Sequence, residues 1–109
     1  MDINEYQQMA RRTAIYPNVG KNMNYPTLGL TSEAGEIAGK VKKVIRDKDG
    51  VFDDDARAAI SKELGDVLWY VAQIASELGL DLSNVAQGNL DKLADRAKRG
   101  TIKGDGDNR

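Results

Sequence analysis

The sequence predicts an all-α protein of four helices in one bundle-like domain that spans residues 1–109. Apolar residues recur at three- and four-residue steps in four segments, which is the spacing of one face of a helix. Clusters of Asn, Asp, Gly and Pro separate these segments. No stretch shows the apolar and polar alternation of strands, and no repeat or linker divides the chain.

The first helix is expected over residues 2–15. Asp2 and Glu5 have the spacing of a capping box, and apolar residues follow at helical steps from Ile3 onward. Residues 16–24 contain Pro, Gly and Asn and are expected to form a loop.

The second helix is expected to begin near Pro26, because proline is well suited to the first turn. Turn residues at positions 47–50 should end it. Its apolar stripe consists of Leu30, Ala34, Ile37, Val41 and Val44.

The third helix should follow Asp53 to Asp55, which suit an N-cap and a first turn, and should run to about Leu78 with Gly79 as its cap. It is the most hydrophobic segment and predicts a wide buried face. That face consists of Ile60, Leu64, Val67, Leu68, Val71, Ile74, Ala75 and Leu78.

The fourth helix is expected between a cap at Asp81 and an end at Gly100. Residues 101–109 are rich in Gly and Asp and have no period, so we expect a flexible tail or a flap. Asp105, Asp107 and Arg109 in this tail could close over a bound ligand or stay disordered. The apolar face of the helix consists of Leu82, Ala86, Leu90, Leu93 and Ala97.

The composition excludes several kinds of site. Lys and Arg number 16 against 17 Asp and Glu, so no overall charge favours nucleic acid or membrane partners. The absence of Cys and His rules out disulfides, thiolate sites and histidine bases, and leaves oxygen-rich sites for hard cations such as Mg²⁺ or Mn²⁺. The N-terminal residues lack the apolar core of a signal peptide, so a cytoplasmic soluble protein is expected.

Two acidic pairs are the candidate catalytic and metal-ligating residues. Glu33 and Glu36 lie three residues apart in the second helix, and Glu63 and Asp66 repeat that spacing in the third. If the two helices run antiparallel with the pairs at one level, four carboxylates converge and a cation offsets their repulsion. The alternative is a solvated acidic surface, which Lys40 and its neighbours Lys42 and Lys43 would neutralise.

An amide and two cations share one side of the fourth helix, at Asn89, Lys92 and Arg96. Cations of this kind can hold a polyphosphate, and an amide can orient a phosphate oxygen. Together with a carboxylate site for magnesium, they indicate nucleotide chemistry. Trp69 and Tyr70 favour a core or interface position over base stacking.

The segments that carry these residues resemble one family. SEAGEIAGKVKK, KELGDVLWYVA and NLDKLADRAKRG are similar to the MazG-like, all-α nucleoside triphosphate pyrophosphohydrolases. The resemblance implies Mg²⁺-dependent hydrolysis between the α- and β-phosphates, with Glu33, Glu36, Glu63 and Asp66 as metal ligands. It implies phosphate contacts from Lys92 and Arg96, with Asn89 between the two roles, and a homodimer or homotetramer with sites completed at subunit contacts.

The resemblance leaves several alternatives open. Many members begin the first motif with two adjacent glutamates, whereas this chain has Ser32, so the number of metal ions and the general base stay open. The lack of histidine argues against the phosphoribosyl-ATP pyrophosphatases. A base-selective enzyme for dGTP, dUTP or dCTP and a non-catalytic helical assembly module are the competing hypotheses. The candidate base-pocket residues are Gln7, Arg11, Asn22 and Asn24.

Overall fold

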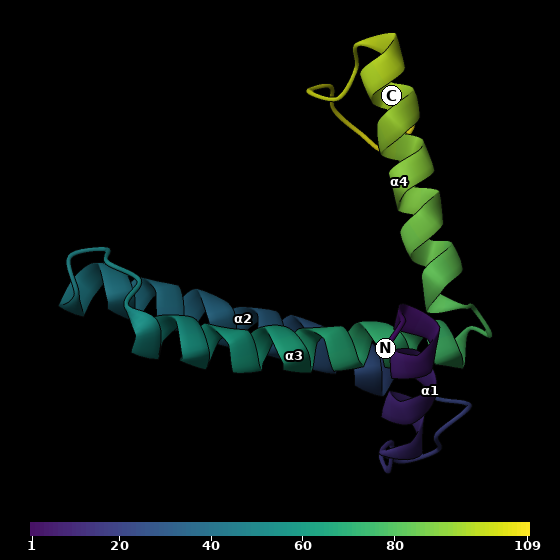
Figure 1. The fold of residues 1–109 in the computed structure, drawn as a ribbon. Helices are drawn as coiled ribbons and strands as arrows, with labels where there is room; N and C mark the ends of the chain where they lie inside the picture. Colours follow the sequence, from purple (N-terminus) through teal and green to yellow (C-terminus); the bar gives the residue numbers. More distant parts are fainter.

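The computed structural model describes all residues from 1 to 109 and confirms the all-α class (Figure 1). It contains four helices and no strand. None of them has both the length and the apolar character that crossing a membrane requires. The helices are α1 (Ile3–Arg12), α2 (Asn24–Asp47), α3 (Asp54–Glu77) and α4 (Leu82–Arg99).

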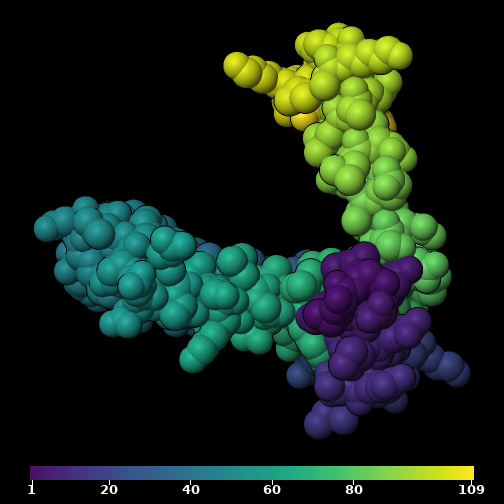
Figure 2. All heavy atoms as spheres, in the orientation of Figure 1, coloured from purple at the N-terminus to yellow at the C-terminus, as the bar shows by residue number.

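Helices α2 and α3 form a long antiparallel hairpin, and α1 lies across the far end of α3 (Figure 1). Helix α4 packs mainly against α1. It projects away from the hairpin as a separate arm (Figure 2). The Cα radius of gyration is 16.8 Å, whereas a compact chain of this length has about 13 Å. A single chain therefore does not close the four helices into a bundle.

Local capping explains most of the helix ends. The carboxylates of Asp2 and Asp53 accept the amides of Glu5 and Ala56, each at 2.8 Å, as the sequence predicts. Gly79 and Gly100 follow α3 and α4 with φ angles of 68° and 72°, a region that glycine adopts without strain.

The predicted cap of α4 is wrong in its chemistry. Asp81 occupies the N-cap position, but its side chain makes no capping hydrogen bond. The Gln7 side-chain oxygen accepts the Leu82 amide at 2.7 Å, and the Asn4 side-chain oxygen accepts the Ser83 amide at 3.1 Å. Helix α1 thus supplies the acceptors that a local side chain was expected to provide.

Two helix ends differ from the expected positions. Helix α1 ends at Arg12, before the predicted end, where the backbone amides of Thr13 and Ala14 donate to the carbonyls of Ala10 and Arg11, three residues back, at 3.0 and 3.1 Å. The Thr13 hydroxyl also donates to the Ala10 carbonyl, at 2.6 Å. Helix α2 begins at Asn24, because the side-chain oxygen of Asn22 accepts the Tyr25 amide at 3.0 Å.

The predicted wide buried face of α3 is only partly covered in the single chain: Ala75 is buried, whereas Leu64, Leu68 and Leu78 are exposed. Leu64 and Leu78 are 55% and 54% exposed. The buried hydrophobic cluster is small and joins α1, α3 and the start of α4. Its members are Ala10, Ala72, Ala75 and Leu82.

The Glu77 carboxylate ties the loop before α2 to the end of α3. Its side chain is 1% exposed. It accepts hydrogen bonds from the Arg11 guanidinium at 2.6 Å, and from the Tyr16 hydroxyl and the Gly20 and Asn22 amides at 2.7 Å each. Burial alone would raise the pKa of Glu77, but these hydrogen bonds outweigh it and lower the pKa to about 2.

We predict that Glu77→Gln lowers the free energy of unfolding by about 2–4 kcal/mol, because buried donors lose their charged acceptor. The carboxyl of the unfolded chain titrates near 4.5 and that of the folded chain near 2. The unaltered protein should therefore lose stability as the pH falls through this window, whereas the variant should lose less. Urea unfolding at several pH values measures both effects.

The exposed turn residue Asp49 supplies a matched control, since Asp49→Asn makes the same chemical change. It should leave stability and its pH dependence unchanged. Equal stability of Glu77→Gln and Asp49→Asn would contradict the role assigned to the Glu77 carboxylate.

Candidate active site

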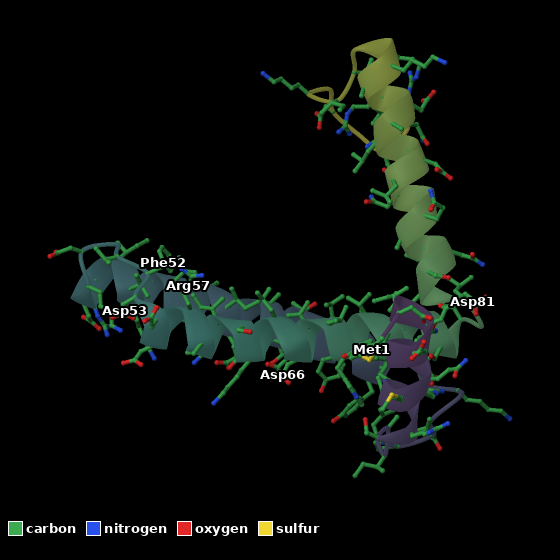
Figure 3. The ribbon with its side chains drawn as sticks, viewed as in Figure 1. Met1, Phe52, Asp53, Arg57, Asp66 and Asp81 are labelled. Atoms are coloured by element: carbon green, nitrogen blue, oxygen red, sulfur yellow. The ribbon has the colours of Figure 1, made fainter.

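Three of the four predicted acids converge at one place. Carboxylate oxygens of Glu33, Glu63 and Asp66 lie within 4.8 Å of one another. Glu33 and Glu63 are partly buried between α2 and α3, whereas Asp66 is exposed. Figure 3 shows Asp66 in the middle part of α3, between the hairpin turn beside Asp53 and the end that α1 covers. The antiparallel hairpin therefore brings the two motifs to one level.

The fourth acid, Glu36, is exposed and lies outside this group of three. It is still close enough to act on the cluster electrostatically. A hydrogen bond with Glu63 raises the pKa of Glu33, and partial burial and the charges of Asp66, Glu63 and Glu36 raise it further. The site thus concentrates negative charge, which a cation would relieve.

An aromatic cluster lies beside the acids. Tyr70 follows Asp66 by one helical turn, and a Cβ atom at Gly29 would lie 2.2 Å from the Tyr70 Cε1 atom. The absence of a side chain at Gly29 therefore lets the Tyr70 ring lie directly against the backbone of α2. Burial raises the pKa of the Tyr70 phenol, and the charges of Glu33 and Asp66 add to the rise.

The aromatic cluster has four members, which include Trp69. Its indole N–H donates to the Thr13 hydroxyl at 2.8 Å, and the residue packs against the hydrophobic cluster. Trp69 is partly buried there, which agrees with the core or interface position expected for it. The other rings are those of Tyr16, Tyr25 and Tyr70.

The structure does not bring the predicted phosphate contacts to the acids within one chain. Asn89, Lys92 and Arg96 all belong to the projecting helix α4 (Figure 1). The residues 101–109 fold back on that helix, and an oxygen of the Asp107 carboxylate lies 2.6 Å from the Lys92 ammonium and 3.0 Å from the Arg96 guanidinium. These hydrogen bonds lower the pKa of Asp107. The sequence pattern does not predict this pairing, because the tail has no helical period to place Asp107.

Three of the four candidate base-pocket residues are used in structural contacts. Gln7 caps α4, and its side-chain N–H group donates to the Leu80 carbonyl at 2.8 Å. Arg11 binds Glu77 through its guanidinium, and Asn22 does so through its backbone amide. Asn24 is exposed at the start of α2. These contacts favour a structural role for the first three.

Comparison with known proteins agrees with this arrangement of helices and acids. The model of the MazG nucleotide pyrophosphohydrolase domain matches residues 24–101, which contain all four acids, Asn89, Lys92 and Arg96. The chain belongs to the MazG nucleotide pyrophosphohydrolase family. The chain is 53% identical to the Gene 37 protein of Mycobacterium phage L5 over 114 residues, and the alignment covers the full length of both proteins. No solved structure matches the chain.

The acid cluster fits the metal dependence that is typical of MazG enzymes. Its donors are carboxylate oxygens alone, which suit hard divalent cations with octahedral or flexible geometry. Glu33 comes from one helix and Glu63 and Asp66 from the other, so rigid elements hold the donors on both sides. The predicted metal ligands therefore include a set that the fold brings together.

We predict that Gly29→Ala destabilises this MazG domain by about 1–3 kcal/mol, because the new methyl group overlaps the Tyr70 ring. Gly35→Ala is the matched control in the same helix, where nothing lies within 4 Å of an added Cβ. That change should be neutral or stabilise by up to about 1 kcal/mol. Thermal unfolding measures both variants, and equal melting temperatures would contradict the packing of Tyr70 on Gly29.

Proposed function

We propose that this protein hydrolyses nucleoside or deoxynucleoside triphosphates between the α- and β-phosphates, with Mg²⁺ as cofactor, and releases the monophosphate and pyrophosphate. The observation that carries the proposal is the convergence of Glu33, Glu63 and Asp66 from two helices in a MazG domain. Such an activity would clean or adjust the cytoplasmic nucleotide pool. A base-selective form of the same activity, for dGTP, dUTP or dCTP, is the narrower version of this proposal.

In this proposal Glu33, Glu36, Glu63 and Asp66 hold the metal. A magnesium ion at this place, or manganese in its stead, would supply Lewis acidity that neutralises phosphate charge and eases deprotonation of water. The oxygen of a water molecule bonds to a phosphorus of the bridge between the α- and β-phosphates. The bond from that phosphorus to the bridging oxygen breaks, and this oxygen leaves with the other product. One proton of the water passes to one of the glutamates, which take the place of the histidine that the chain lacks.

We assign Asn89, Lys92 and Arg96 to the phosphates of the substrate, and this requires a second copy of the chain. Within one chain α4 points away from the acids, so these side chains would have to reach the acids of a partner (Figure 1). The substrate phosphates would then take the place of the Asp107 carboxylate at Lys92 and Arg96. The proposed active site is thus shared between two subunits.

The exposed surface supports such an association. The chain exposes 7778 Å², roughly 1,800 Å² more than a compact monomer of its mass. One partner in a standard interface loses about 800 Å², so the excess is large enough for an obligate homodimer or homotetramer. The exposed surface includes an apolar groove of about 220 Å³ beside the start of α4. Leu30, Val71, Ile74, Leu78 and Val85 are among its lining residues.

We predict that Asp66→Asn and Glu63→Gln reduce pyrophosphate release at least a hundredfold, because each removes a ligand charge and leaves the core intact. We also expect both variants to weaken Mg²⁺ binding and the thermal stabilisation that the ion gives. Calorimetry and product chromatography on a panel of triphosphates measure these effects. Asp49→Asn is the control and should behave as the unaltered protein does.

Two results would contradict the proposal. A protein that neither binds Mg²⁺ nor gains stability from it would be a helical assembly module with a solvated acidic surface. Release of orthophosphate in place of pyrophosphate would show that a different phosphate bond is broken.

Sharing of the site predicts complementation between two inactive proteins. A dimer of an Asp66→Asn chain and a Lys92→Ala chain should have one intact site of two, with acids from one subunit and Lys92 from the other. Since half of the dimers in an equal refolded mixture are mixed, activity at low substrate should reach about a quarter of normal. If Lys92 serves the acids of its own chain, the mixture should not exceed the sum of the separate proteins.

A further inference from the structure

Lys40 is a cation that the fold of one chain brings to the acid cluster. Its ammonium nitrogen lies 3.8 Å from an oxygen of Glu63. This separation is too long for a direct hydrogen bond, so Lys40 is attracted to the carboxylate but not tied to it. The Lys40 side chain is 36% exposed and that of Glu63 is 18% exposed. The ammonium group is therefore open to a ligand at the border of the site.

Several cations of the chain form closer ion pairs away from the acid cluster. The Arg11 guanidinium lies 2.6 Å from the buried Glu77 carboxylate, and the Lys48 ammonium lies 2.9 Å from Asp53. Lys92 and Arg96 both contact Asp107 on the projecting helix. Of the ion pairs within the chain, the pair of Lys40 and Glu63 is the one that includes a member of the acid cluster.

Lysines follow the acids along α2 towards the hairpin turn. Along α2, Glu33, Glu36, Lys40 and Lys43 follow one another at steps of three or four residues and so share one side of the helix. Lys40 and Lys43 also line a groove of about 200 Å³ between α2 and α3, and its other charged lining residues are Lys48, Asp47 and Asp55. Lys40 thus lies both at this groove and beside the acid cluster, and it is the lining cation nearest to a cluster carboxylate among the ion pairs of the chain.

We propose that Lys40 binds the pyrophosphate part of the substrate, so that the β- and γ-phosphates extend from the acid cluster towards the hairpin turn. This inference rests on the proposed function and adds to it the direction in which the triphosphate lies. A triphosphate bound at the acids brings several negative charges, and a lysine ammonium binds phosphate oxygens as a mobile point charge. The nucleoside then extends in the opposite direction, towards α1 and the tyrosines.

Removal of the Lys40 charge should affect the binding of Mg²⁺ and the binding of pyrophosphate differently. A positive charge 3.8 Å from a ligand carboxylate opposes the binding of a metal cation, so its removal should leave Mg²⁺ affinity unchanged or stronger. Removal of an ammonium group that binds phosphate should weaken the binding of pyrophosphate. A lysine that only stabilised the hairpin would leave the affinity for pyrophosphate unchanged.

The test is calorimetric titration of the full-length protein, first with Mg²⁺ alone and then with inorganic pyrophosphate at saturating Mg²⁺. Lys40→Ala should weaken pyrophosphate binding about tenfold or more, the value of one charge-assisted hydrogen bond. Lys40→Arg keeps the charge and should restore most of the affinity. Lys42→Ala is the matched control, because it removes the same charge from an exposed position outside the groove.

Equal pyrophosphate affinity of the Lys40→Ala and Lys42→Ala proteins would overturn the role of Lys40, whereas the proposed function would stand. Loss of Mg²⁺ binding in Lys40→Ala would also overturn it, because the variant would then have damaged the metal site itself. A different result would contradict the proposed function itself. If the unaltered protein binds no Mg²⁺, or if Asp66→Asn does not weaken that binding, both the proposed function and the role of Lys40 are wrong.

Discussion

The packing of α2 against α3 holds oxygens of Glu33, Glu63 and Asp66 within 4.8 Å of one another, against their mutual repulsion. Each of these side chains projects from a regular helix, so the site inherits its geometry from the hairpin and not from a loop. Its rigidity comes from many small contacts, among them the direct approach of Tyr70 to the backbone at Gly29. Chemistry that needs a concentrated negative charge is therefore built on the most regular part of the fold.

Helix α3 connects this site with the rest of the molecule. Its middle carries Glu63 and Asp66, and its last turn carries Glu77, which binds Arg11 of α1 and the loop before α2. The loop and the first helix are thus fixed by one buried carboxylate. Its pKa of about 2 shows how strongly the surrounding donors favour the charged form.

The single chain has too small a core for its apolar surface. Three of the four residues in the buried cluster are alanines, while several leucines of α3 and α4 are exposed. Small domains bury a modest fraction of their surface, and association with a second copy is a common way to bury more. In this protein the same association would bring Lys92 and Arg96 to a set of carboxylates, so stability and catalysis would depend on one interface.

The sequence by itself determined the helical segments, the caps at Asp2 and Asp53, and the two acidic pairs, because these features depend on residues three or four positions apart. Only the tertiary structure decided the caps of α4 by Gln7 and Asn4, because those partners are 75 and 79 positions apart. It also decided that α4 leaves the hairpin, since the direction of a helix after a short turn depends on which apolar face finds a partner. Local periodicity specifies elements, whereas the placement of elements follows from contacts between residues that are distant in the chain.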